Sequence, residues 1–357
     1  MSPYFNQSEE WKQFFLQANN DNHSVIDVEF EGVTTIVYEY PLVKGFKFWY
    51  VPRLYFELDN ESVEGYEIVL KGLVNNIRNM AKASRVVHIS FDFDERLLNR
   101  FSGNEYSIAG LKRVTGINLW KPIKKLQYLS TPTLPVDKLV GDSKGTVQEF
   151  FKENEKGFFS RTNKTCRNLT RRSLEKGWEC DFAKIDQDFE DFWAIWESTA
   201  NRQGFNLHPK NYIKSLLTNE FAKLIVIRNQ QNKVQGGWVL VYINNSVINL
   251  YGANSQESLD NGGQYYFHTF ALKYIKSLIE EGKFVEFYDL GGSDEEGYGN
   301  FKKSYKPDYI SFIGQFDHVL SPHIYLPLKL VKNVKELLKN SKIKLIQLLR
   351  SIKTFSN

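Results

Sequence analysis

The order of expected strands and helices constrains the fold most, because it is similar in the two halves of the chain. In the first half, residues 25–53 alternate as strands do, residues 62–83 have helical periodicity, and residues 85–94 resemble another strand. In the second half, three strands over 222–255 precede a helix over 262–282 and a strand over 283–290. Strands that alternate with helices build mixed sheets flanked by helices. The sequence therefore predicts an α/β (α+β) protein with a duplicated unit, although no repeat is visible residue by residue.

Several further elements follow from the same periodicities. We expect a helix over residues 5–20, a connection between the halves over the Pro-rich segment 121–137, and a helix, a basic helix and a strand over 145–185. Two more helices are expected over 188–205 and 211–221. The helix at 62–83 is predicted to bury one face, formed by Val63, Ile68, Val69, Leu73, Ile77 and Met80.

Length and composition limit the class of protein. A chain of 357 residues exceeds one ordinary core, so two domains of roughly 100–200 residues each are expected. The N-terminus has no basic start followed by an apolar run, and no window is apolar enough to span a bilayer, so we expect a cytoplasmic protein. Cys166 and Cys180 do not form a disulfide framework. Cys166 is either a thiolate activated by its basic neighbours or, as we favour, an ordinary thiol.

Positive charge is concentrated in two places. The segment from Leu328 onward contains eight Lys and Arg residues and one Glu, so its net charge is +7, and the net charge of the remainder is near −3. Residues 331–357 are predicted to form a basic amphipathic helix, which either contacts an anionic membrane or packs on the first domain. The second place is the helix around 161–176, where one face suits a tRNA or diphosphate backbone unless it is simply solvated. Its candidate phosphate-binding residues are Lys164, Arg167, Arg171 and Arg172.

Four stretches in this order resemble the FemABX family of non-ribosomal peptidyltransferases. They are GFKFWYVPR (45–53), SRTNKTCRNLTRRSLEKGWEC (160–180), STANRQGFNLHPKNYI (198–213) and YDLGG (288–292) followed by FKKSYKP (301–307). The resemblance implies transfer of an amino acid from aminoacyl-tRNA to the stem peptide of a peptidoglycan precursor, lipid-linked or UDP-linked. It implies no metal and no small cofactor.

The resemblance also implies two GNAT-like domains, the first completed by a segment that follows the second. We therefore expect residues 1–140 plus about 317–330 as the first domain, 141–316 as the second, and 331–357 as the terminal helix. A GNAT-like, acyl-CoA-dependent transferase acting on a polysaccharide or lipid is the alternative. The loop SQESLDNGGQYY (255–266) lacks the basic residue and glycine spacing of a pyrophosphate loop, and its glycines suit a simple turn. A third reading is a non-catalytic protein that binds membranes or nucleic acid.

Site residues follow from the matched positions. Lys302, after Phe301, matches the lysine that stabilises the oxyanion of acyl transfer. Asp92 and Asp289 end strands and are either general bases or turn caps. Substrate contacts are expected from six further residues, which are Arg202, His208, Tyr212, Tyr251, Gly291 and Lys303. His208 stands before Pro209 where relatives have an arginine, so Arg202 or Lys210 could bind phosphate instead. Ser304-Tyr305-Lys306 replaces the family's Gly-Phe-Gly.

Overall fold

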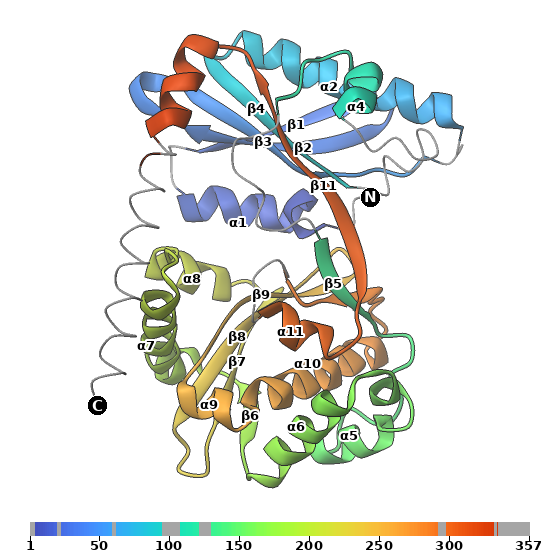
Figure 1. Ribbon diagram of the computed structural model, residues 1–357, viewed down its shortest axis with the longest axis vertical. Helices are drawn as coiled ribbons and strands as arrows, with labels where there is room; N and C mark the ends of the chain where they lie inside the picture. The colour runs from blue at the N-terminus through green and yellow to red at the C-terminus, as the bar shows by residue number, and fades with distance from the viewer. Residues whose placement is uncertain are drawn as a thin grey trace, which may run out of the picture.

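The computed structural model shows eleven strands in one continuous order, with helices on both sides (Figure 1). It describes residues 4–19, 23–58, 62–94, 108–120, 130–291, 298–331 and 334. The strand order is β1-β2-β3-β4-β11-β5-β10-β9-β8-β7-β6. The acidic loop after YDLGG, at 292–297, and most of the expected terminal helix lie outside the described residues.

The first half is a mixed sheet in which three antiparallel strands are followed by a parallel one. The strands are β1 (Ser24–Phe30), β2 (Val33–Pro41), β3 (Lys47–Leu54) and β4 (Val86–Asp94). The β3–β4 pair is parallel, which requires the crossover helix α2 (Val63–Lys82) between them. The helices α2 and α4 (Ile108–Thr115) cover one face, and α1 (Glu9–Asn19) lies between this sheet and the second half (Figure 1).

The second half repeats this arrangement. Its strands are β6 (Glu179–Phe182), β7 (Ala222–Arg228), β8 (Val234–Ile243), β9 (Ser246–Asn254) and β10 (Phe287–Asp289). The first four are antiparallel neighbours, and β10 is parallel to β9 after the crossover helix α10 (Gly263–Glu280). The remaining helices are α5 (Val147–Asn154), α6 (Lys164–Glu175), α7 (Ile185–Gln203), α8 (Lys210–Leu217), α9 (Gln256–Asp260) and α11 (Tyr298–Lys303). The 3-10 turns are η1 (Phe5–Gln7), η3 (Val43–Gly45) and η4 (Phe158–Arg161).

One long strand joins the halves. β11 (Asp308–Val319) pairs with β5 (Ser130–Pro135) through its first residues and with β4 through its last ones. The chain therefore returns from the second half to the first sheet near residue 312 (Figure 1). The expected domain boundaries stay a prediction, but β11 provides the return that they require.

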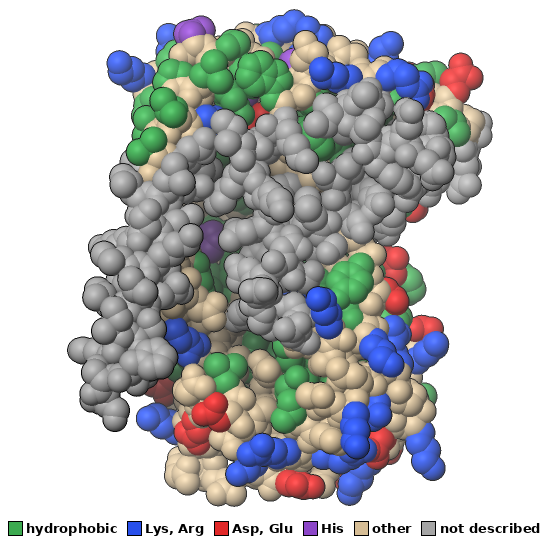
Figure 2. Space-filling view, viewed as in Figure 1, with side chains coloured by type: hydrophobic (Ala, Val, Ile, Leu, Met, Phe, Trp, Pro, Cys, Tyr) green, Lys and Arg blue, Asp and Glu red, His purple; other side chains and the backbone are tan. Residues whose placement is uncertain are grey.

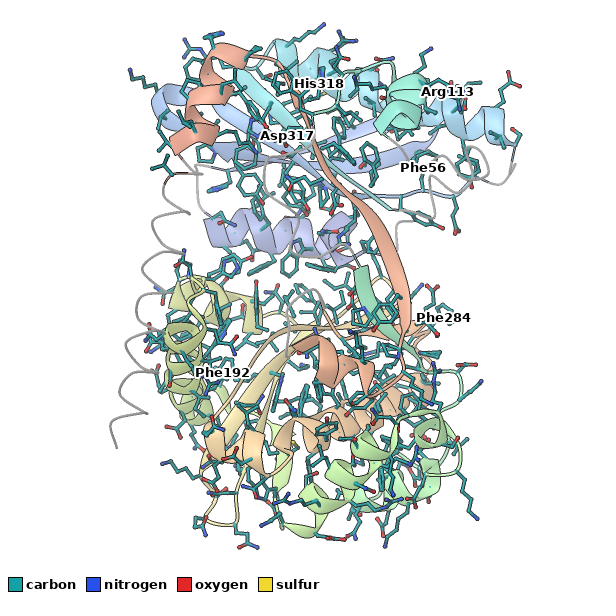
Figure 3. The ribbon with its side chains drawn as sticks, viewed as in Figure 1. Phe56, Arg113, Phe192, Phe284, Asp317 and His318 are labelled. Atoms are coloured by element: carbon teal, nitrogen blue, oxygen red, sulfur yellow. The ribbon has the colours of Figure 1, made fainter. Side chains whose placement is uncertain are left out.

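Three hydrophobic clusters hold these layers together. One lies between α2 and the first sheet, and a second lies between the second sheet and α5, α6 and α10. The third combines α1 and β2 with α7, α8 and the opposite face of the second sheet. Trp11 and Phe14 of α1 belong to this cluster together with Phe192 of α7 (Figure 3). The two halves thus share buried apolar surface.

Two expectations about the first half were wrong. On α2, Val63, Ile68 and Met80 are exposed, whereas Val69, Leu73 and Ile77 are buried as predicted. The buried face instead includes Tyr66, Leu70, Val74 and Ala81, because α2 turns this stripe toward the sheet. The segment 121–137 is more than a connection, since residues 130–135 form β5 between β10 and β11.

The chain beyond β11 begins with helical residues 322–331. This helix is fastened to the first sheet by Asp317, which is fully buried and accepts hydrogen bonds from Ser90 and Tyr325 (Figure 3). The ammonium of Lys329 lies 2.8 Å from the same carboxylate. Lys329 therefore belongs to the anchored part of the chain, although its charge was counted with the basic tail. None of the described helices is long and apolar enough to cross a bilayer.

Candidate active site

Lys302 is a buried cation in the short helix α11, with only 6% of its surface exposed. Its Nζ donates a hydrogen bond of 3.1 Å to the carbonyl oxygen of Gly291, just beyond the end of β10. Burial of a charged lysine is unusual unless other groups solvate it. Lys303, by contrast, is exposed, and both residues lie on the helix α11.

Gly291 shapes the position of Lys302. Its φ of 76° lies in the left-handed region, which a residue with a side chain rarely adopts. A Cβ at this position would lie 3.1 Å from the carbonyl oxygen of Asn249 and 3.7 Å from Lys302 Nζ. The YDLGG turn therefore requires a glycine where β10, β9 and α11 meet.

Asp289 organises the same turn from the end of β10. Its carboxylate accepts hydrogen bonds from the backbone N–H of Gly291, at 2.7 Å, and from the hydroxyl of Thr131. Burial raises the pKa of Asp289, and these hydrogen bonds with the charges of Arg53 and Lys302 only partly offset the rise. The geometry is that of a turn cap, which was one of the two readings of this residue.

Aromatic rings surround Phe301, the residue that precedes Lys302. Phe301 contacts the rings of Tyr265, His268 and Tyr305 at centroid distances of 4.9, 5.1 and 5.6 Å. His268 is 2% exposed and its Nδ1 lies 2.9 Å from the hydroxyl of Tyr288. Burial, followed by the charge of Lys302, lowers the pKa of His268 to about 3. The imidazole is therefore neutral at physiological pH and serves as a hydrogen-bonding group.

A cavity of about 380 Å³ opens against Lys302. β9 and the α7–α8 loop form its walls, and α10 and α11 close it. Four sets of side chains line it, which are the aromatic residues Trp196, Phe205, Trp238, Tyr251 and Phe301, the amides Gln203, Asn206, Asn249, Asn254 and Gln264, the basic residues His208, His268 and Lys302, and the leucines Leu207, Leu250 and Leu290. This volume suits a small organic group with a few directed polar contacts.

The cavity gathers some of the expected substrate residues and leaves others outside. His208, Tyr251 and Gly291 line it with Lys302, and His208 stacks on Tyr212 at 4.7 Å. Desolvation between these rings lowers the pKa of His208, although its edge stays accessible. Arg202 and Lys303 are exposed and do not line the cavity. The alternative cation Lys210 is paired with Glu190.

Asp92, the other candidate base, lies in the first half and does not line this cavity. Its carboxylate is 3.2 Å from Nε of Arg53 and accepts a 3.4 Å hydrogen bond from the hydroxyl of Tyr50. Burial raises the pKa of Asp289, and the charge of Arg53 is among the effects that partly oppose this rise, so the same arginine acts on both aspartates. Arg53 has a φ of 47°, a strained conformation of the kind that clusters at functional sites.

The basic helix α6 is partly occupied by contacts within the chain. The guanidinium of Arg167 donates to the carbonyl oxygens of Phe159, Ser160 and Thr162, so it closes the preceding 3-10 turn. Arg171 is paired with Glu155. Lys164 and Arg172 are exposed. On the face in Figure 2, Lys and Arg side chains of the lower half are interspersed with Asp and Glu.

The structure also shows the surroundings of Cys166 and of the glycine loop at the start of α10, which were considered as a nucleophile and as a pyrophosphate loop. Cys166 is buried, and burial raises the pKa of its thiol to about 11, which is the reverse of an activated thiolate. At the start of α10, Gly262 and Gly263 are buried. Cβ atoms there would meet the Leu169 carbonyl oxygen at 3.1 Å and the Ser258 hydroxyl at 2.3 Å. The chain therefore packs closely against both glycines, and Gly262 has the left-handed conformation that a turn into α10 requires.

His268, Asn249 and the two tryptophans were not anticipated as site residues. His268 occurs in an apolar helical run and Asn249 in an apolar strand, where a single polar residue carries little signal. The fold brings them into the same cavity as Lys302, which is distant from them in the sequence.

Comparison with known proteins identifies the fold. No family model matches the chain, and no curated protein matches it. Among solved structures, it is similar to FemX, with a TM-score of 0.66 and 17% identity over 91% of this chain and 94% of that one. The FemABX-like fold expected from the motifs, with two tandem GNAT-like units, is thereby confirmed.

Two more distant structures share the overall arrangement. L-PGS from Bacillus licheniformis matches with a TM-score of 0.50 and 10% identity over 88% of this chain and 92% of that one. A conserved protein of unknown function from Bacteroides thetaiotaomicron matches with a TM-score of 0.50 and 12% identity, covering 89% of this chain and 99% of that one. At these identities the likeness concerns the fold.

Proposed function

We propose that the protein is an aminoacyltransferase that moves an amino acid from aminoacyl-tRNA to an amine on the stem peptide of a peptidoglycan precursor. The observation that carries this proposal is the buried ammonium of Lys302 at the wall of a 380 Å³ cavity. The FemX-like fold and the matching position of Lys302 in the YDLGG…FK stretch support it.

The proposed reaction is attack of an amine on the ester carbonyl of the donor. The transition state concentrates negative charge on the former carbonyl oxygen, and a fixed cationic donor stabilises that charge. Lys302 suits this role because its burial and its hydrogen bond to Gly291 hold the ammonium in place. The same contacts limit its movement, so little reorganisation is needed when the oxyanion forms.

Asp289 and Asp92 are less suited to act as the base. Asp289 is already engaged by Thr131 and Gly291, and Asp92 by Arg53 and Tyr50. We assign Asp289 to positioning of the turn that carries Gly291. Phe301 packs against His268 and shapes the cavity beside the lysine. We assign His208 and Tyr251, which line the cavity, to substrate contact, and Tyr212, which stacks on His208, to support of that histidine.

The partners of this reaction are an aminoacyl-tRNA and a lipid-linked or UDP-linked muropeptide. Lys164 and Arg172 on α6 are exposed and are the residues of the basic helix that we assign to the tRNA backbone. Arg167 and Arg171 support the helix through the contacts described above. The enzyme would work in the cytoplasm, at the inner face of the membrane.

Membrane contact through residues 330–357 is part of this proposal. On the described helix that leads into this segment, Leu326, Leu330 and Val331 are 49%, 65% and 53% exposed. Apolar side chains next to a segment rich in lysine favour an anionic bilayer surface.

The proposal is tested by a transfer assay with the full chain. Radiolabelled aminoacyl-tRNAs and, separately, labelled acetyl-CoA are each offered with lipid-linked and UDP-linked muropeptides. We expect label to move from tRNA to one precursor. Transfer from acetyl-CoA alone would establish the acyl-CoA alternative, and transfer from neither donor would refute the proposed reaction.

A further inference from the structure

Asn249 lies where two parallel strands separate at the wall of the cavity. Pairing between β9 and β10 reaches Ile248 and Asp289, and Asn249 is the next residue of β9. On its other side, β9 contains an extra residue, because Leu240 pairs with Asn249 while Val239 pairs with Tyr251. Such a bulge redirects side chains and is common beside active sites. As a result, Asn249, Leu250 and Tyr251 all line the cavity.

The side-chain oxygen of Asn249 is an unmet hydrogen-bond acceptor. Oδ1 is buried and finds no donor within the described part of the chain. A buried acceptor without a donor costs about 1–3 kcal/mol, so such groups generally await a partner. Asn249 itself lies close to the turn that binds the Lys302 ammonium, because its backbone carbonyl oxygen would be 3.1 Å from a Cβ at Gly291, whose own carbonyl accepts from that ammonium.

The charge at this end of the cavity limits what can bind there. Lys302 contributes a positive charge, and no Asp or Glu is found among the described lining residues. Asp289, which is close by, is engaged by Thr131 and Gly291. A like charge disfavours the charged form of an entering amine. An amine would therefore enter this position as the neutral base, which is also the nucleophilic form.

We infer that Asn249 determines specificity for an amine nucleophile, by accepting a hydrogen bond from the neutral primary amine of the acceptor. This inference rests on the proposed function and deepens it. The amine releases its ammonium proton to solvent on entry. Its lone pair then forms the C–N bond to the donor carbonyl while the ester C–O bond breaks. One of the remaining amine protons passes to the departing ribose oxygen, giving an amide and a free hydroxyl. Asn249 holds the nitrogen and takes no proton.

Amine binding can be measured without turnover. The full chain is titrated with n-butylamine and with butanone, which lacks an N–H donor, and binding is followed by NMR at pH 7, 8 and 9. We expect the affinity for butylamine to rise about tenfold per pH unit, as for a ligand that must lose one proton to bind. The affinity for butanone should not change with pH.

Two isosteric variants separate hydrogen bonding from charge. Asn249→Leu should weaken butylamine binding about tenfold and leave butanone unaffected. Asn249→Asp should instead bind the charged amine and lose the rise with pH, so it tests the site even if the leucine variant does not fold. Asn201→Leu, on the exposed surface of α7, is the matched control. Unchanged amine binding in both Asn249 variants, or wild-type binding that is independent of pH, would overturn the inference.

The transfer assay gives a second readout. Asn249→Leu should raise the KM for the muropeptide about tenfold and leave the KM for the aminoacyl-tRNA unchanged. If the wild-type protein transfers label but this KM split is absent, the inference about Asn249 fails while the proposed function stands. If the wild-type protein uses neither donor but binds butylamine as described, the reaction fails and the amine site stands.

Discussion

The ammonium nitrogen of Lys302 lies 3.1 Å from the carbonyl oxygen of Gly291, so the two ends of the YDLGG…FK stretch are in direct contact. The turn at Gly291 is itself held by the Asp289 carboxylate. A strand end, a glycine turn and a short helix therefore act together to present one buried cation to the cavity. This arrangement leads to the first two predictions.

Lys302→Ala should greatly reduce turnover without unfolding the protein. Loss of one donor to a developing oxyanion costs about 100- to 1,000-fold in kcat. Lys303→Ala is the matched control, because that neighbouring lysine is exposed. Rates are measured in the transfer assay and folding by circular dichroism. Undiminished transfer by the Lys302 variant would rule out the proposed role.

Gly291→Ala should reduce turnover and stability together. The left-handed backbone costs a residue with a side chain about 1–2 kcal/mol, and the new methyl group would press on the Asn249 carbonyl oxygen at 3.1 Å. Thermal unfolding and kcat report the two effects. Gly282→Ala is a useful comparison, since its φ is also positive and its Cβ would meet nothing within 4 Å. Equal loss of turnover in both variants would contradict a special role for Gly291.

The order of elements was largely predictable from the sequence, because helical and strand periodicities are local. The orientation of α2 was not predictable, since Val63, Ile68 and Met80 offer an apolar stripe that competes with the one actually buried. The strand β5 was also missed. Prolines discourage a central strand, but Pro132 and Pro135 are tolerated here, and the Pro132 carbonyl accepts a hydrogen bond from Leu290.

The candidate site was predictable where it lies within one motif and unpredictable where it depends on distant segments. Lys302 and Gly291 belong to one recognisable stretch. Asn249 and His268 become site residues only because β9 and α10 pack against that stretch. For the same reason, Arg167 looked like a ligand for phosphate, whereas its partners are carbonyl oxygens of the preceding turn.

His268 should make the protein sensitive to acid. Burial lowers the pKa of His268 to about 3 from an ordinary value of 6.5. Between these two pH values the imidazole is protonated in the unfolded state and neutral in the folded state. Stability should therefore fall as the pH drops from about 6.5 toward 3, by up to about 1.4 kcal/mol per pH unit from this group. His268→Gln should flatten this dependence in urea unfolding measured between pH 4 and 7. An unchanged slope would show that another group dominates.

Asp317→Asn should loosen the helix at 322–331. Burial alone would raise the pKa of Asp317, but the charges of His88 and Lys329 and the hydrogen bond from Ser90 lower it. Its stabilising contribution is therefore present above the unfolded pKa near 4 and is lost as the pH falls through the lower folded value. Breaking such a buried pair costs about 3 kcal/mol at neutral pH. The exposed Asp308 provides the control variant Asp308→Asn, which should be nearly neutral in the same unfolding assay.

Truncation after Lys329 should separate membrane binding from folding. The shortened chain keeps the ion pair of Lys329 with Asp317, so the helical residues before Lys329 stay attached to the first sheet. It loses the exposed Leu330 and Val331 and seven of the eight cations counted from Leu328 onward. Sedimentation with anionic vesicles should fall to the level seen with zwitterionic vesicles, while the melting temperature stays the same. Unchanged sedimentation would place the membrane contact elsewhere, and a lower melting temperature would instead show that the tail packs on the first domain.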